Sequence, residues 1–284
     1  MSVEATTRAP ASAGDPTVPR EGSRWAEAST RSLHGRCWQA PSTRRAVPIV
    51  VVHGLGVASR MCQPVAARLA RWHPVYAPDL AGFGRSRGGS VLDIDAHADD
   101  LAAWLGAMRL ERPVVVGVSV GSQVVTALVQ RHADLCRGAV LGSPTVDASR
   151  RSWLRQLPRW QLEQATQSMR MRAIQVADYA RAGIPRVVRT FAGALADRPE
   201  ARLPDVTVPV LVCWGTRDPL LSRWWATTLT EAAPQGRLRV IPGGLHALTH
   251  ESALEFARVI LHFVPRGLDD ATPSSHAAST CNGG

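Results

Sequence analysis

Short, nearly continuous runs of apolar residues alternate along the chain with longer stretches whose apolar residues recur every three or four positions. A short apolar run predicts a strand that is buried on both faces, as in a parallel sheet. Such runs lie at 48–52, 114–118, 138–143 and 208–214, with weaker ones at 33–39, 73–79 and 237–241. The stretches at 60–72, 94–108, 223–232 and 251–263 have helical spacing, and we expect His97, in the second of them, to lie at the surface. Because strands and helices alternate, we predict an α/β fold with a doubly wound, mostly parallel sheet.

The alternation is interrupted between 147 and 204, where no run of strand type occurs. Apolar residues recur there at helical spacing, which predicts one helix; they are Leu162, Ala165, Met169, Ala173, Val176 and Ala180. A helix that Pro158 ends or bends precedes this stripe, and a third helix follows it around 187–195. We therefore expect an all-helical insertion at 147–204, a candidate lid on a core made of 31–146 and 205–265.

Both ends of the chain are rich in small and polar residues. Residues 1–24 lack the apolar stretch of a secretory signal, and we expect 1–30 and 266–284 to be disordered. The sequence contains no run of 18 apolar residues, so we predict no membrane span.

Composition excludes further classes of function. The net charge is +10, but all 33 basic residues are Arg, and no basic cluster with interleaved aromatic residues resembles a nucleic-acid module. Only the net charge supports a nucleic-acid binder, and we predict that the protein does not bind nucleic acid. The cysteines are scattered, odd in number and lack the spacing of metal ligands, which indicates reduced thiols in a cytoplasmic protein; they are Cys37, Cys62, Cys136, Cys213 and Cys281.

The strand at 114–118 runs into a G-x-S-x-G pattern, and apolar residues at helical spacing follow it. A strand, a sharp turn and a helix in this order predict a nucleophile elbow with Ser119 at the turn. Gly117 and Gly121 leave room where a Cβ would meet neighbouring backbone. The start of the helix directs its amide groups and its positive dipole end at an oxyanion. The alternative is a simple Gly/Ser turn.

Two more polar residues follow strands. Asp218 comes after the strand at 208–214, and His246 comes after the strand at 237–241. Ligands of open α/β sheets bind at the carboxyl ends of the strands. We therefore predict a catalytic triad with Ser119 as nucleophile, His246 as base and Asp218 as the acid that orients it. Asp147, which follows the preceding strand, is the alternative acid.

The strand at 48–52 leads into His53-Gly54-Leu55-Gly56. A loop of this kind leaves backbone amides free, and we predict the Leu55 and Val120 N–H groups as an oxyanion hole. The substrate pocket is expected to include Trp153, Trp160 and Met169, together with His53, for which a purely structural place in the loop is the alternative. The sequence implies no metal and no organic cofactor.

As a set, these motifs and the turn at 79–86 resemble the α/β-hydrolase family in its lid-bearing branch, over residues 31–265. The resemblance implies acyl transfer through Ser119 on a small carboxylic ester. Carbon–carbon bond hydrolases of this fold usually have Asn and Trp where this sequence has Val118 and Ala247. This difference speaks against that activity, which is kept as an alternative. A cofactor-free perhydrolase is another, and a non-catalytic ligand receptor is an alternative of a different class.

The predicted lid is strongly basic. Eleven Arg lie between 150 and 202 against four acidic residues, which are Glu163, Asp178, Asp197 and Glu200. Two interpretations stay open. The Arg side chains form a solvated polar face, or they attract an anionic substrate or an anionic surface that presents one.

Overall fold

The computed structural model describes residues 20–28, 31–39, 46–88 and 93–266. Within these residues eight strands form one sheet in the order β1-β2-β4-β3-β5-β6-β7-β8. The strands are β1 (Arg20–Ala28), β2 (Arg31–Gln39), β3 (Ile49–Val52), β4 (Val75–Pro78), β5 (Val114–Val118), β6 (Gly138–Gly142), β7 (Val210–Gly215) and β8 (Gly236–Ile241).

All pairings from β4 through β8 are parallel, and β1 and β2 add an antiparallel edge. Every residue of β3, β5 and β6 is buried, which explains why their sequences are continuously apolar. The predicted α/β fold with a doubly wound, mostly parallel sheet is confirmed.

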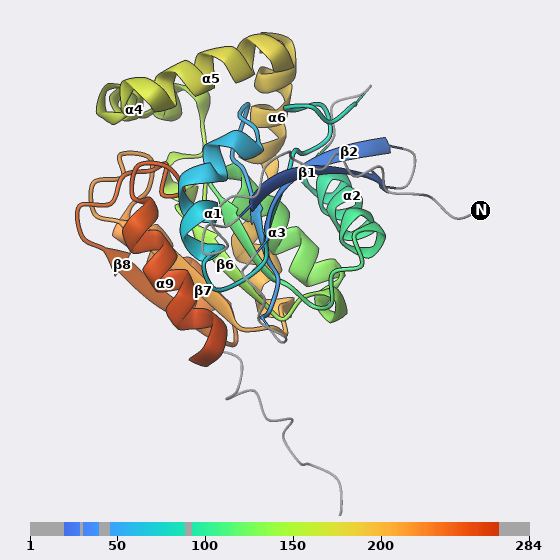
Figure 1. Ribbon diagram of the computed structural model, residues 1–284. Coiled ribbons are helices and arrows are strands. Elements are labelled where there is room, and N and C mark those ends of the chain that lie inside the picture. Colours follow the sequence, from blue (N-terminus) through green and yellow to red (C-terminus); the bar gives the residue numbers. More distant parts are fainter. Residues whose placement is uncertain (1–19, 29–30, 40–45, 89–92, 267–284) are drawn as a thin grey trace, which may run out of the picture.

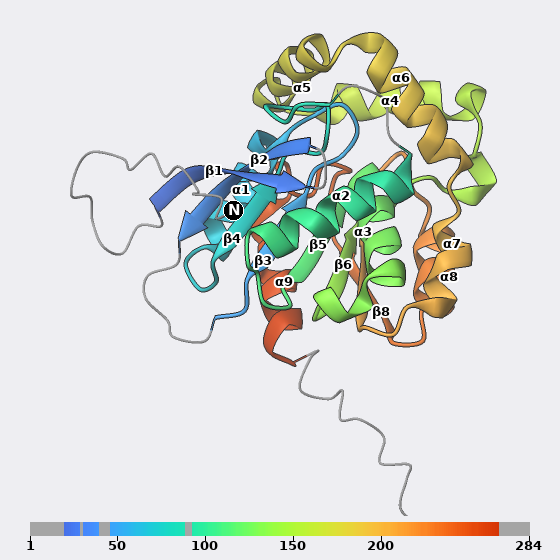
Figure 2. The same ribbon diagram turned by 90° about the vertical axis from the view of Figure 1, so that its right-hand side faces the viewer.

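Helices cover both faces of the sheet (Figure 2). One face packs against α2 (Ile94–Ala107), α3 (Val120–Arg131) and α8 (Arg223–Ala232), with Trp104 and Trp225 fully buried. The other face packs against α1 (Gln63–Leu69), which follows the short η1 turn (Ser59–Cys62), and against α9 (Ala253–Arg266). A second short turn, η2 (Ala133–Leu135), leads from α3 to β6. Among the described residues, no helix is both long enough and apolar enough to cross a membrane.

Between β6 and β7 the chain is helical, and α4, α5 and α6 extend over one end of the sheet (Figure 1). The elements are η3 (Ala148–Arg150), α4 (Trp153–Thr166), α5 (Met169–Ala182), α6 (Ile184–Ala196), α7 (Pro199–Arg202) and η4 (Leu203–Asp205). We call the segment 148–205 the helical insertion.

The single helix predicted from the stripe at 162–180 is wrong, because α4 ends and α5 begins within it. Ser168 caps α5, since its hydroxyl accepts a hydrogen bond from the Met171 N–H at 3.2 Å. Pro158 does not end the preceding helix but lies inside α4.

Two further expectations need correction. Residues 20–28 are not disordered but form β1, which pairs with β2 along its whole length, and the Trp25 ring packs against His34. Residues 1–19, 29–30 and 267–284, also predicted to be disordered, lie outside the described residues, whereas Arg266 ends α9. His97, expected at the surface, is 2% exposed beside Phe83, and burial lowers its pKa to about 3.

Candidate active site

Ser119 lies at a sharp turn between β5 and α3. Its φ of 57° and ψ of −126° fall in a region that a residue with a Cβ adopts only under strain. Two backbone hydrogen bonds hold the turn: the Ser119 N–H donates to the Gly142 carbonyl at 3.0 Å, and the Ser122 N–H donates to the Ser119 carbonyl at 2.9 Å. At this turn Ser119 borders the cavity described below.

Three glycines allow the close packing around this turn. A Cβ on Gly117 would lie 2.3 Å from the Gly121 carbonyl oxygen, and a Cβ on Gly121 would lie 2.4 Å from the His53 carbonyl oxygen. A Cβ on Gly54 would stand 3.2 Å from the Ser119 Cβ. The loop after β3 therefore runs directly beside Ser119, as the predicted oxyanion hole requires.

Asp218 and His246 meet at the carboxyl ends of β7 and β8. His246 Nδ1 lies 2.8 Å from Asp218 Oδ2, while Asp218 Oδ1 accepts hydrogen bonds from the Leu220 and Leu221 N–H groups at 2.8 and 3.2 Å. Because an ionised carboxylate only accepts, Nδ1 carries the proton and Nε2 keeps its lone pair. His246 Nε2 has no hydrogen-bond partner among the described residues, and His246 lines the same cavity as Ser119.

The environment of His246 changes its affinity for a proton. Burial lowers its pKa, but the charge and hydrogen bond of Asp218, together with the charge of Glu163, outweigh burial and raise the pKa above the ordinary value of 6.5. The site thus stabilises the imidazolium more than water does, and the imidazolium is the form that a base reaches when it accepts a proton.

The alternative acid, Asp147, is bound elsewhere. Its carboxylate accepts hydrogen bonds from the backbone and hydroxyl groups of both Ser149 and Ser222, at 2.6 to 3.2 Å. These contacts join the start of the helical insertion to the start of α8. Asp218, and not Asp147, is the carboxylate that contacts His246.

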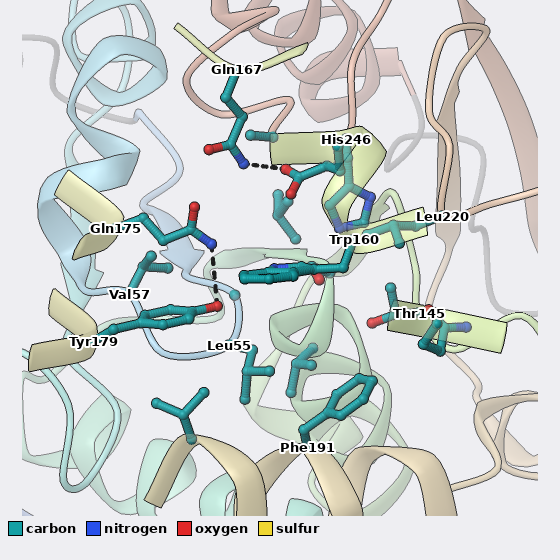
Figure 3. Close-up of a pocket in the computed structure, with 18 of the residues that line it drawn as sticks. Leu55, Val57, Thr145, Trp160, Gln167, Gln175, Tyr179, Phe191, Leu220 and His246 are labelled. Atoms are coloured by element: carbon teal, nitrogen blue, oxygen red, sulfur yellow. Dashed lines mark hydrogen bonds between the residues drawn. The ribbon is translucent and has the colours of Figure 1, made fainter. Parts of the chain in front are cut away.

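A cavity of about 300 Å³ lies between the sheet and the helical insertion (Figure 3). Ser119, His246, Leu55 and Val120 all line it, so the predicted nucleophile, base and oxyanion donors share one space. Further lining residues come from the insertion and include Trp153, Gln156, Trp160, Glu163, Gln167, Met171, Gln175, Tyr179, Val187 and Phe191.

Of the four residues predicted for the pocket, Trp153 and Trp160 line the cavity and the other two do not. Met169 is 77% exposed at the start of α5, and Met171 takes the position facing the cavity. His53 is fully buried behind the loop: its Nδ1 bonds the Gly54 carbonyl and its Nε2 accepts from the Leu80 N–H. His53 therefore fixes the shape of the loop, the structural alternative named above.

The sequence analysis missed the polar part of this cavity. Glu163 is 4% exposed, and its carboxylate accepts hydrogen bonds from the side-chain amides of Gln164 and Gln167. Burial raises the pKa of Glu163, and this exceeds the opposing effect of His246. Glu163 lies three residues after Trp160 on α4, so helical spacing from the predicted pocket residue was the signal that could have found it.

The Arg side chains of the insertion lie elsewhere. Among the described residues that line the cavity there is no Arg. Several of these Arg pair with acids of the insertion, such as Arg151 with Glu200 at 2.9 Å and Arg202 with Asp197 at 2.8 Å. Nor is any group of three or more His, Cys, Asp and Glu residues within the described ranges arranged to hold a metal ion.

The family model for serine aminopeptidase, S33, matches residues 43–253. The chain belongs to this family of α/β hydrolases. The α/β hydrolase matches a curated relative from Neisseria meningitidis (serogroup A), a pimeloyl-(acyl-carrier protein) methyl ester esterase, with 27% identity over 249 residues and 78% of each chain covered.

Solved structures share the fold. The enol-lactonase from Burkholderia xenovorans LB400 superposes with a TM-score of 0.66 at 22% identity, over 84% of this chain and 99% of that one. An E-2-(acetamidomethylene)succinate hydrolase superposes with a TM-score of 0.72 at 19% identity, over 86% of this chain and 99% of that one. These matches show the α/β-hydrolase fold.

Proposed function

We propose that this hydrolase cleaves a small carboxylic ester through an acyl-enzyme on Ser119. The observation that carries the proposal is the 2.8 Å contact between His246 Nδ1 and Asp218 Oδ2, with Ser119 lining the cavity that His246 also lines. A base held in one tautomer by a buried acid, beside a strained serine, is the arrangement that activates a hydroxyl as a nucleophile.

In the first step Ser119 Oγ attacks the ester carbonyl and His246 Nε2 takes its proton. The Leu55 and Val120 N–H groups stabilise the oxyanion of the tetrahedral intermediate. The C–O bond to the alcohol then breaks as His246 gives its proton to the departing alkoxide. Water repeats the sequence on the acyl-enzyme, which releases the carboxylic acid and free Ser119.

Other observations support an ester as substrate. The relative from Neisseria meningitidis is named for the cleavage of a methyl ester. Apolar side chains, among them Trp153, Trp160 and Phe191, dominate the cavity wall and suit an acyl or ring group. We further propose that the helical insertion acts as a lid on this cavity, and that the protein works in the cytoplasm, where the four buried thiols of the described residues stay reduced.

A fluorophosphonate probe tests the proposal, because it labels only an activated serine. We expect one labelled peptide, containing Ser119, and hydrolysis of p-nitrophenyl esters from a panel of chain lengths. Ser119→Ala should remove labelling and lower kcat at least about 10³-fold without changing the melting temperature. Activity of this variant within tenfold of the parent, or labelling at another residue, would refute the assignment.

A further inference from the structure

The cavity contains a cluster of hydrogen-bond acceptors that the proposed reaction does not use. Glu163, Gln167 and Gln175 all line it from the helical insertion, and they are 4%, 8% and 7% exposed. Figure 3 shows Gln167 and Gln175 around the same space as Trp160 and His246. Because charged and amide groups are costly to bury, their position in a largely apolar cavity needs a physical reason.

Each amide nitrogen already donates one hydrogen bond. Gln167 Nε2 donates to the Glu163 carboxylate, and Gln175 Nε2 donates to the Tyr179 hydroxyl at 3.2 Å. When Glu163 is ionised its carboxylate only accepts, so the Gln167 amide nitrogen faces it and the amide oxygen lies on the other side. The Oε1 atoms of Gln167 and Gln175 have no hydrogen-bond partner among the described residues. Both of these atoms are acceptors, so a ligand that brings donors would satisfy them.

The charge of the cavity also favours a ligand that brings donors over one that brings a carboxylate. When ionised, Glu163 contributes a negative charge, and no Arg is among the described residues that line the cavity. A second carboxylate brought into this space would lose its hydration and meet a like charge. The arginines of the insertion, which act from outside the cavity, do not remove this cost.

Resting on the proposed ester hydrolysis, we propose that Glu163 and the free amide oxygens of Gln167 and Gln175 determine specificity. They select substrates that carry a hydroxyl or N–H group near the scissile ester, and they reject substrates with a carboxylate at that place. Leaving such acceptors unpaired is what penalises an analogue without the donor.

The test compares p-nitrophenyl esters whose acyl chains are equal in length and end in hydroxyl, methyl or carboxylate, and a second series that varies the alcohol in the same way. In at least one series the parent protein should prefer hydroxyl to methyl about tenfold or more in kcat/KM, and it should disfavour carboxylate further. Glu163→Leu should abolish the preference for hydroxyl, and Glu163→Gln should raise kcat/KM for the carboxylate ester about tenfold. Glu200→Gln makes the same chemical change outside the cavity and should alter neither ratio.

A parent that does not distinguish hydroxyl from methyl in either series, or variants with parental ratios, would overturn this inference even if esters are cleaved. Failure of the proposed function would look different, since no ester would then be hydrolysed. In that case calorimetry replaces kinetics and measures the binding of amides with the same hydroxyl- and methyl-terminated chains to Ser119→Ala. Tighter binding of the hydroxyl compound, weakened by adding Glu163→Gln, supports the inference. Equal binding of the two compounds refutes it. Melting curves check that each variant is folded.

Discussion

Replacing Asp218 by Asn exchanges one carboxylate oxygen for an amide nitrogen, and the surrounding hydrogen bonds allow only one orientation of the new amide. The Asn oxygen can still accept from the Leu220 and Leu221 N–H groups, which Asp218 Oδ1 does now at 2.8 and 3.2 Å. Its amide nitrogen then faces His246 Nδ1 and donates to it. His246 must therefore move its proton to Nε2, the atom that has to accept the proton of Ser119. The fold is kept, and the base is lost.

The expected loss in kcat is about 10³- to 10⁴-fold, the effect of a triad histidine held in the wrong tautomer. The free energy of unfolding should fall by no more than about 1 kcal/mol, because the two backbone hydrogen bonds persist. Asp147→Asn is the matched control. Its amide nitrogen must face the backbone N–H of either Ser149 or Ser222, which leaves a buried donor unpaired and costs about 1–3 kcal/mol of stability.

The two variants should therefore separate turnover from stability. Steady-state kinetics on one ester measures the first quantity, and urea unfolding followed by Trp fluorescence measures the second. Asp218→Asn should be stable and inactive, whereas Asp147→Asn should be active wherever it is folded. If folded Asp147→Asn loses more turnover than Asp218→Asn, the acid has been assigned to the wrong residue.

Three further outcomes are expected. Gly117→Ala should lower the free energy of unfolding by about 2–3 kcal/mol, because its Cβ would lie 2.3 Å from the Gly121 carbonyl oxygen. Gly193→Ala, where nothing lies within 4 Å of the new Cβ, should raise it by about 0.5–1 kcal/mol; equal urea midpoints for the two variants would contradict the packing argument. Because the pKa of His246 is raised, kcat/KM should be lost as pH falls through a value above 6.5. Glu163→Gln removes a charge that raises this pKa, so the loss of kcat/KM should occur at lower pH in this variant. The same pH dependence in parent and variant would contradict an effect of Glu163 on His246. If the Arg of the insertion attract anions, kcat/KM for anionic esters should fall between low and physiological salt while neutral esters of equal size are unaffected; equal salt dependence would leave these Arg as solvated surface.

The proposed reacting groups could be located from the sequence because each follows a strand. Once β5, β7 and β8 are recognised, parallel pairing brings their carboxyl ends to one edge, and Ser119, Asp218 and His246 come with them. The choice between Asp218 and Asp147 was open, since both follow strands of the sheet. Only the position of His246 relative to each carboxylate distinguishes them, and that depends on side-chain geometry.

Strand β1 could not be predicted for a different reason. Its residues are mostly small or polar, and their exposure alternates only between intermediate and exposed. Such a segment becomes a strand by pairing with β2, whose own residues are largely buried. Tertiary pairing decides the structure there, and local composition does not reveal it.

The helical insertion does not bury the apolar stripe that its helical spacing predicts. The apolar stripe chosen from helical spacing faces outward: Leu162, Met169 and Val176 are 56%, 77% and 71% exposed. The face directed at the cavity carries Glu163 and Gln167. A helix that packs on a core buries its apolar side, but the inner face of α4 borders a cavity, where side chains are open to a ligand. Polar residues placed inside against the hydrophobic pattern are therefore what a binding site requires, and the same departure from the pattern led us to Glu163 as a determinant of specificity.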